Sequence, residues 1–345
     1  MSLPSQRVRD SAIFICSRAE HVSIQTEGVQ KAADYLTSEV LSLSCNETQL
    51  GDADIDPKGS DQDRTDWIFF ISALNFCFWR SDTIYLVVFR DREYSGYRGF
   101  CAAVARAVQA GIPLYRPEFY SQISEARLGE LLKPEVGEIP LCMKRTQILR
   151  EVGSVLCEMG GSFLPLVLSC QGSTQRLVSS VLDKFPSFRD ESPSTHEPGR
   201  QVYFYKRAQI LSADLWYHFK GSGPGAFHDI NELTMFPDYR VPQVLYSLGA
   251  ISYSPELMGI IKRGQQLEAG GKIEQELRGT SVRCVEVLKE LIIARLGEVG
   301  LDKARENGWE INSVSLDYFL WRYSKRERIK VETSVPHHRI ITTFY

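Results

Sequence analysis

The sequence predicts a mainly α-helical fold with one small antiparallel β element near residues 83–97. Apolar residues recur at helical spacing through most of the 345-residue chain, most clearly at Cys284, Val285, Leu288, Ile292 and Leu296. The β-branched and aromatic run TIYLVVF (83–89), by contrast, is followed at once by RDREYSGY (90–97), a pattern typical of a hairpin with its turn at residues 90–92.

The first third of the chain begins with an amphipathic pattern in QKAADYLTSEVLSL (30–43), which predicts a helix. The acidic, turn-rich stretch 44–66 that follows is predicted to be a surface loop. WIFFISALNFCFW (67–79) is apolar on nearly every side, so we expect it to be buried.

The central region predicts a series of helices separated by glycine and proline. Helical spacing runs through residues 100–108, 118–132, 144–159 and 173–185. A further helix is predicted over 204–220, where Arg207, Leu211 and Asp214 share one face at i, i+4 and i+7. The face of a helix that is buried does not normally carry unpaired ionisable groups, because their desolvation is costly. Arg207 and Asp214 are therefore candidates for a functional or ion-paired role.

The next stretch is rich in turn formers and holds Asp238. Asp229, with Glu232 three residues later, predicts a capping pair that opens a short helix in DINELTMF (229–236). Pro242 suits the first turn of another helix, which ends at Gly249. Asp238 therefore lies in a tight connection, where aromatic and imino neighbours exclude water and suit a carboxylate to proton transfer. The alternative is a helix-cap or turn residue, and spacing does not decide between them.

The C-terminal third predicts helices over 257–263, 284–296 and INSVSLDYFLWRYSKRERIK (311–330), with a final strand in RIITTFY (339–345). No internal repeat and no clear linker occur. We therefore expect residues 1–345 to form a single compact catalytic unit, with two closely packed helical lobes as the alternative.

Composition and charge restrict the classes of partner. A net charge of −3 without a basic run argues against a stable nucleic-acid complex, yet a small anionic substrate remains compatible. The eight scattered cysteines lack metal-site spacing and are typical of reduced thiols. No run reaches the roughly 20 apolar residues that span a bilayer. We expect a soluble, cytoplasmic protein with no membrane partner; its oligomeric state is left open.

Three long runs resemble the queuosine salvage family, the queuosine 5′-phosphate N-glycosylases/hydrolases: FYKRAQILSADLW (204–216), TMFPDYRVPQVL (234–245) and ALNFCFW (73–79). Weaker similarity extends from about residue 60 to the C-terminus. The resemblance implies release of free queuine from queuosine 5′-phosphate with no metal or redox cofactor. It also implies a helical fold similar to helix-hairpin-helix DNA glycosylases, although the gap between the loop GSGPG (221–225) and Asp238 is longer than in that superfamily.

Hydrolysis of an N-glycosidic bond needs a negative charge near the oxocarbenium-like sugar, a base for the water, and hydrogen bonds to the departing base. We expect Asp238 to have the leading catalytic role. Asp214, the second catalytic candidate, and Lys206 would bind base or ribose. The remaining substrate-binding candidates fall into three groups: Phe76, Trp79, Phe236 and Tyr239 for stacking; Asn75, Gln243 and Asp317 for polar edges; and Arg240, Arg278, His338 and Arg339 for the 5′-phosphate.

Each candidate also has a purely structural interpretation. The aromatic residues could be core, and the charged residues could be solvated or ion-paired. His337 adjoins His338, so the sequence does not decide which imidazole faces a ligand. The rival function is a non-enzymatic binding protein for a modified nucleoside or tRNA, in which the same aromatic residues would stack a base.

Overall fold

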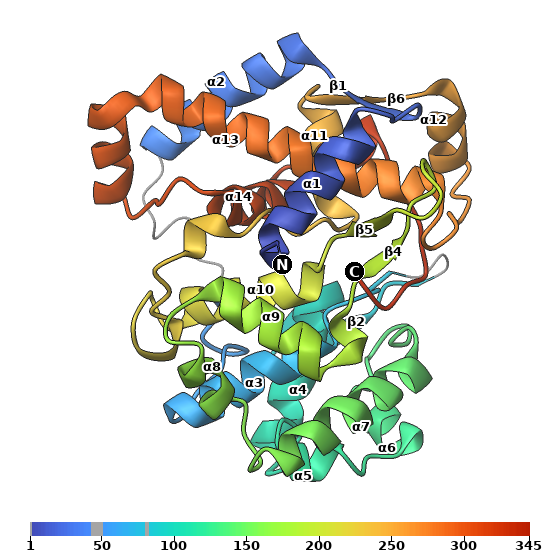
Figure 1. Ribbon diagram of the computed structural model, residues 1–345. Coiled ribbons are helices and arrows are strands. Elements are labelled where there is room, and N and C mark those ends of the chain that lie inside the picture. The colour runs from blue at the N-terminus through green and yellow to red at the C-terminus, as the bar shows by residue number, and fades with distance from the viewer. Residues whose placement is uncertain (1, 43–50, 80–82) are drawn as a thin grey trace. The chain divides into compact units, whose positions relative to one another are not determined.

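The computed structural model describes residues 2–42, 51–79 and 83–345. The chain divides into two compact units, which are described separately. The first unit contains residues 2–42, 191–206 and 231–341, and the second contains 51–79, 83–190, 207–230 and 342–345. Helices α1 to α15 dominate the described residues, and the strands form small antiparallel pairs (Figure 1), which confirms the predicted mainly α fold class.

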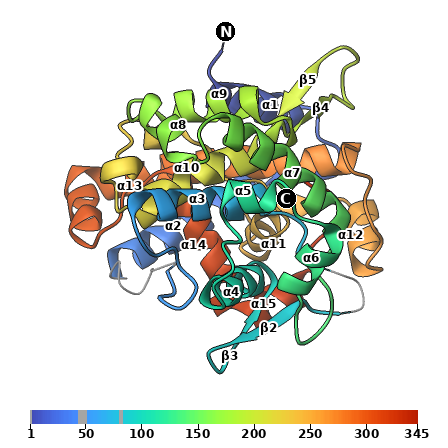
Figure 2. The same cartoon turned by 90° about the horizontal axis from the view of Figure 1, so that it is seen from below.

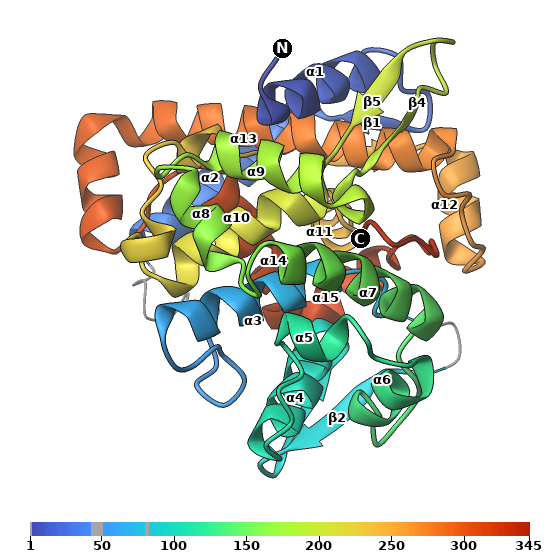
Figure 3. The same ribbon diagram turned by 60° about the horizontal axis from the view of Figure 1, so that its bottom comes forward.

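The first unit is built on the long helix α13, and α1 and α2 lie along it (Figures 1 and 3). A Cβ at Gly279 would come within 2.8 Å of Ile15, so glycine permits the close approach of α1 to α13. The unit contains α1 (Pro4–Cys16), β1 (Val22–Ile24), α2 (Thr26–Ser42), β4 (Glu191–Pro193), β5 (Gln201–Tyr203), α11 (Arg240–Ser247), β6 (Ile251–Tyr253), α12 (Pro255–Lys262), α13 (Lys272–Glu306), α14 (Ser313–Arg326) and α15 (Arg328–Ser334).

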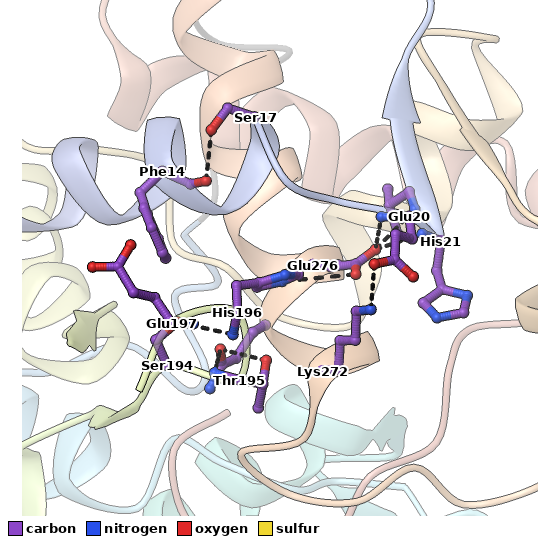
Figure 4. A network of polar contacts seen from close by, with 12 residues as sticks. Phe14, Ser17, Glu20, His21, Ser194, Thr195, His196, Glu197, Lys272 and Glu276 are labelled. Carbon is purple, nitrogen blue, oxygen red and sulfur yellow. Dashed lines mark hydrogen bonds and ion pairs between the residues drawn. The ribbon is translucent and has the colours of Figure 1, made fainter. Parts of the chain in front are cut away.

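The first unit also contains two short antiparallel strand pairs. β1 pairs antiparallel with β6, with Val22 opposite Tyr253, and β4 pairs with β5. The chain before β1 is held by the buried carboxylate of Glu276, whose Oε2 accepts the main-chain N–H groups of Glu20 at 3.0 Å and His21 at 2.6 Å (Figure 4). A buried carboxylate is thus stabilised by the amide groups of a turn.

The second unit surrounds the buried helix α3, whose Phe69 ring lies 4.2 Å from that of Phe163 and 5.0 Å from that of Phe185. The predicted burial of residues 67–79 is confirmed for 67–78, whereas Trp79 is half-buried. The unit contains α3 (Asp61–Ala73), β2 (Leu86–Phe89), β3 (Arg92–Ser95), α4 (Gly96–Gln109), α5 (Pro117–Tyr120), α6 (Glu125–Leu131), α7 (Cys142–Glu158), α8 (Leu164–Ser169), α9 (Thr174–Lys184), the 3₁₀ turns η2 (Pro186–Phe188) and η3 (Gly223–Gly225), and α10 (Lys206–His218), whose first residue belongs to the first unit.

The predicted hairpin is confirmed as β2–β3, and α4 packs against it (Figure 2). Its two turn residues, Arg90 and Asp91, both have positive φ, at 50° and 59°. Such a two-residue turn matches the right-handed twist of the strands that it joins. The turn therefore lies at the predicted position.

The predicted helix over 229–236 is wrong. Only a 3₁₀ turn forms there, η4 (Ile230–Glu232), and residues 233–238 have no regular structure. The carboxylate of Asp229 instead accepts the Ser173 hydroxyl at 2.7 Å and the Thr174 N–H at 2.6 Å, so it caps α9. Asp229 therefore caps a helix that is distant in the sequence, and not the local helix that the sequence pattern predicted.

Other boundaries also differ from expectation. The helix predicted over 118–132 is divided into α5 and α6, and the helix predicted over 311–330 is divided into α14 and α15. Helix α3 begins at Asp61 because Ser60 and Asp63 form a capping box, so residues 61–66 of the expected loop 44–66 are helical; residues 44–50 lie outside the described part of the chain. The final strand over 339–345 is wrong. That stretch is divided between the two units and forms one isolated bridge, from Arg339 to Gln266.

Within the described residues, no helix is long and apolar enough to cross a membrane.

Candidate active site

The two oxygens of the Asp238 carboxylate have different surroundings. Oδ1 accepts the main-chain N–H groups of Arg240 at 2.7 Å and Val241 at 3.0 Å, the first two residues of α11. Oδ2 accepts no hydrogen bond from the described residues, and the side chain is only partly buried. One oxygen therefore fixes the orientation of the carboxylate, while the other is available to a ligand or a water molecule.

The segment that leads to Asp238 is held by side chains from two other helices. Asp317 on α14 accepts the N–H of Phe236, and Arg278 on α13 donates to the carbonyl of Pro237. The Phe236 ring is buried, 6.0 Å from the Tyr318 ring. These predicted site residues thus lie together in the first unit.

Several cationic side chains lie near Tyr239 and His337. Arg240 donates to Glu332 at 2.7 Å and to Gln243 at 3.1 Å, while the Tyr239 ring lies 5.1 Å from His337. Burial, followed by the charges of Arg240, Arg339 and Lys325, lowers the pKa of His337 to about 3. His337 is therefore neutral at physiological pH and lies among three cations.

Lys325 is a member of this group that sequence reasoning missed. It lies on α14, 5.3 Å above the Trp321 ring, with its side chain still exposed. Partial loss of hydration lowers the pKa of Lys325 to about 8, with Arg240 acting in the same direction and Asp238 in the opposite one. The basic run SKRER (324–328) was the signal that could have identified it.

Residues 335–339, near the C-terminus, pack against the start of α11. Gln243 is buried and donates to the carbonyl of Val335 at 2.8 Å. His338 is 2% exposed, and burial, followed by the charges of His337 and Arg278, lowers its pKa to about 3. Arg339 donates to the carbonyl of Gly264 at 3.3 Å. A neutral, buried His338 can offer a hydrogen bond but supplies no charge to a phosphate.

Lys206 begins α10 under backbone strain. The residue before it, Tyr205, has a φ of 52°, which is rare for an aromatic side chain. The Tyr205 hydroxyl donates to Glu191 at 2.9 Å, and Lys206 is itself buried. The burial of Tyr205 and its hydrogen bond to Glu191 hold this left-handed conformation directly before the helix that carries Lys206.

In the second unit, Asn75 and Phe76 lie in an irregular segment after α3. The Phe76 ring is fully buried, 4.3 Å from the Arg145 guanidinium and 5.3 Å from that of Arg207. Asn75 is buried as well, while Trp79 is partly exposed. Cations above the ring favour a structural role for Phe76, since they occupy the surface that a stacked base would need.

Asp214 is partly buried on α10. Burial raises the pKa of Tyr97, and the charges of Cys101 and Asp214 raise it further. Asp214 thus lies close to a phenol and a thiol that remain protonated. The predicted site residues divide accordingly: Lys206, Phe236, Asp238, Tyr239, Arg240, Gln243, Arg278, Asp317, His338 and Arg339 belong to the first unit, and Asn75, Phe76, Trp79 and Asp214 to the second.

Comparisons with known proteins point to one family. Residues 55–345 match the family model described as "Queuosine salvage protein". A relative from Mus musculus is 38% identical over 346 residues, 99% of each chain, and one from Nematostella vectensis is 35% identical over 344 residues, 98% of each. A relative from Sphaerobacter thermophilus is 37% identical over 280 residues, 81% of this chain and 80% of its own. All three are named queuosine 5′-phosphate N-glycosylase/hydrolase.

Proposed function

The chain belongs to the queuosine salvage family, and from that premise we propose that it hydrolyses the N-glycosidic bond of queuosine 5′-phosphate and releases queuine for salvage into tRNA. The similarity supports this function because it extends over nearly the whole chain and over nearly the whole of the relatives from Mus musculus and Nematostella vectensis. The mechanism depends on one observation about the Asp238 carboxylate. Its Oδ1 accepts two main-chain hydrogen bonds, whereas its Oδ2 accepts none from the described residues.

Asp238 acts at the sugar. As the bond to the base breaks, positive charge develops on the ribose, and a fixed carboxylate stabilises that charge more in the transition state than in the ground state. The same Oδ2 orients a water molecule for attack on the sugar carbon and accepts its proton. The hydrogen bonds to Oδ1 keep the group in place, so little reorganisation is needed during the reaction.

The departing base is a 7-deazapurine and lacks the N7 that accepts a proton in guanine. Departure therefore depends on several hydrogen bonds to other edges of the ring. Gln243 and Asp317, which belong to the same unit as Asp238, are the candidates for those edges, while Asn75 in the second unit stays a prediction. Lys206 is a candidate for base or ribose, and Phe236 and Tyr239 for stacking. Asp214 and Trp79, which belong to the second unit, stay predictions.

The 5′-phosphate would be held by the cations near Tyr239. Arg240, Arg339 and Lys325 each lie close enough to His337 to lower its pKa, and Lys325 lies close enough to Asp238 for the two charges to interact. An arginine fork matches two phosphate oxygens, and a lysine adds a point charge. Arg278 and His338, the other phosphate candidates, are buried. We place this activity in the cytoplasm.

The test is direct. Purified protein is incubated with queuosine 5′-phosphate, and the release of queuine is followed by chromatography. Wild-type protein is expected to release queuine, and Asp238→Asn to lose at least ~10³-fold in kcat while still binding substrate. Asp302→Asn, a matched change at an exposed aspartate of α13, serves as the control. Binding without release by the wild type would favour the alternative, a non-enzymatic binding protein for a modified nucleoside or tRNA.

A further inference from the structure

The chain passes from β5 into α10 through only two residues. β5 ends at Tyr203 and α10 begins at Lys206, so Phe204 and Tyr205 make up the whole connection. Lys206 is 5% exposed although its side chain carries an ammonium group. Because the connection is so short, the backbone of Tyr205 sets where the first residue of α10 lies relative to β5.

The backbone of Tyr205 is in the left-handed region, with a φ of 52°. This region brings Cβ close to the following carbonyl oxygen, so it is unfavourable for bulky side chains. Lys220, just beyond the other end of α10, has nearly the same φ, 53°, but left-handed residues are common where a helix ends. Tyr205 precedes a helix and is 1% exposed, so other contacts have to hold its conformation.

Two contacts hold the Tyr205 side chain in place. Its buried ring lies 5.6 Å from the Tyr203 ring, and its hydroxyl donates to Oε2 of Glu191 at 2.9 Å. Glu191 is the first residue of β4 and lies opposite Tyr203 in the β4–β5 pair. Burial raises the pKa of Tyr205, so the phenol keeps its proton and donates it to the carboxylate in a charge-assisted hydrogen bond. The strand pair therefore anchors the residue that joins it to α10.

We propose that Tyr205 is a positioning residue that acts through Lys206: the buried ring and the hydrogen bond to Glu191 hold a left-handed backbone, which places Lys206 for contact with the substrate. This inference rests on the proposed function, in which Lys206 binds the base or the ribose. A strained backbone persists where the surrounding structure holds it, and such strain is concentrated at functional sites. Because a shift of about 1 Å in a contacting group can reduce turnover by ~10²-fold, the conformation of the residue before Lys206 affects catalysis.

Three variants separate the hydroxyl, the ring and the backbone of Tyr205. Queuine release from queuosine 5′-phosphate is followed with enzyme in excess, so that slow variants are still measured. Tyr205→Phe loses only the bond to Glu191 and is expected to lower kcat/KM by ~3- to 10-fold. Tyr205→Ala also loses the ring and keeps a Cβ that disfavours positive φ, so a loss of ~100-fold is expected. Tyr205→Gly loses the same contacts but adopts positive φ freely, and is expected to keep at least ~5-fold more kcat/KM than Tyr205→Ala.

The order of glycine and alanine tests the role of the backbone. Where φ is negative, glycine is less favourable than alanine, because it loses more conformational freedom on folding. A value of kcat/KM for Tyr205→Gly at or below that of Tyr205→Ala would therefore overturn the inference. If Tyr205→Ala does not fold, Tyr205→Phe and Glu191→Gln, which weaken only the hydroxyl bond, carry the test, and unchanged kcat/KM in both would overturn it.

A double-mutant cycle measures whether Tyr205 acts through Lys206. In the Lys206→Met background, adding Tyr205→Phe is expected to leave kcat/KM within ~twofold, because the group that Tyr205 positions is gone. The fall in Tm caused by Tyr205→Phe is expected to be the same in both backgrounds, since the bond to Glu191 is lost in each. An equal fold-loss of kcat/KM in the two backgrounds would give Tyr205 a structural role alone and overturn the inference.

Lys220 provides the matched control, because it is a left-handed residue beside the same helix, is exposed, and is no part of the proposed site. Lys220→Ala is expected to keep kcat/KM within ~twofold of wild type. A loss in Lys220→Ala equal to that in Tyr205→Ala would show general loosening of α10 and overturn the inference. Failure of the wild type to release queuine would instead contradict the proposed function, and unchanged kcat/KM in Lys206→Met would contradict the substrate contact assigned to Lys206.

Discussion

Asp238 combines two roles that its sequence context presents as alternatives. A helix cap and a catalytic carboxylate both suit an aspartate in a tight connection before a helix. In the structure Oδ1 caps α11, while Oδ2 accepts no hydrogen bond from the described residues. The cap is compatible with catalysis, because it uses one oxygen and keeps the other in a constant direction.

Variants at Asp238 can separate these two roles. Asparagine retains a carbonyl oxygen that accepts the N–H groups of Arg240 and Val241, so Asp238→Asn is expected to keep the free energy of unfolding within ~0.5 kcal/mol of wild type. Asp238→Ala loses the cap and is expected to cost roughly 1 kcal/mol. Urea denaturation measures both. If the asparagine variant is as unstable as the alanine variant, its loss of activity could not be assigned to the chemistry.

The pKa of Lys325 gives the proposed phosphate site a distinct pH dependence. With a pKa of about 8, the Lys325 ammonium is charged at pH 7 and mostly neutral at pH 9. Because the neutral amine no longer attracts a phosphate dianion, KM for queuosine 5′-phosphate is expected to rise roughly three- to tenfold over that interval. Lys325→Arg stays charged and is expected to flatten the rise. The same rise in Lys325→Arg would exclude Lys325 as its cause.

At the scale of elements, buried arginines hold the irregular segments that carry predicted site residues. Arg145 and Arg207 donate to main-chain carbonyls around Asn75 and Phe76, as Arg278 does beside Asp238. A guanidinium offers five donors in one plane, so a single side chain can satisfy several carbonyls at once. Arg207 and Arg278 were interpreted from sequence as a helix-face cation and a phosphate ligand, because hydrophobic patterning places arginine at the surface.

Arg145 tests this structural role. Its guanidinium donates to the carbonyls of Pro140, Leu74, Phe76 and Cys77 and is fully buried. Arg145→Lys keeps the charge, but an ammonium cannot reach all four carbonyls, so we expect a loss of at least ~2 kcal/mol in the free energy of unfolding. Arg176→Lys, at an exposed position on α9, is expected to stay within ~0.5 kcal/mol. Equal stability of the two variants would contradict the role assigned to Arg145.

Over the whole molecule, sequence reasoning succeeded where the signal was local. Apolar spacing over 284–296 indicated α13, and the run 83–97 indicated the hairpin β2–β3. The predicted end at residue 296 is confirmed, because the backbone leaves the helical conformation at Gly297, whose φ is 58°, before a second helical stretch runs to Glu306. The start was missed: α13 begins at Lys272, where the more polar sequence does not show helical periodicity. The expectation of one compact catalytic unit stays a prediction, as does the similarity to helix-hairpin-helix DNA glycosylases.

Contacts between distant parts of the chain were not predictable from the sequence. β1 and β6 have three residues each and lie more than 200 residues apart, so neither gives a period-two signal. Asp229 caps α9 across more than 50 residues, which no local pattern records. The same holds for the bonds of Asp317 and Arg278 to the segment before Asp238: the residue types were identified as candidates, but their partners came only from the structure.

Three histidines with lowered pKa values make both units sensitive to acid. Burial, with help from Arg64, lowers the pKa of His218 to about 4 in the second unit, and the pKa values of His337 and His338 lie at about 3 in the first. In the unfolded chain these histidines bind protons near pH 6.5, where the folded protein does not, so they leave stability unchanged well above that pH and reduce it below. At pH 5 the neutral, buried His338 alone costs about 2 kcal/mol relative to pH 7.5.

Urea denaturation at pH 7.5, 6.0 and 5.0, followed by a probe in each unit, measures this loss. His218→Gln removes the proton-binding group from the second unit and is expected to flatten the pH dependence there, while the first unit keeps its own. The reason is that the sensitivity comes from proton binding to the unfolded chain, and glutamine binds no proton in either state. An unchanged slope in His218→Gln would assign the acid sensitivity to other groups.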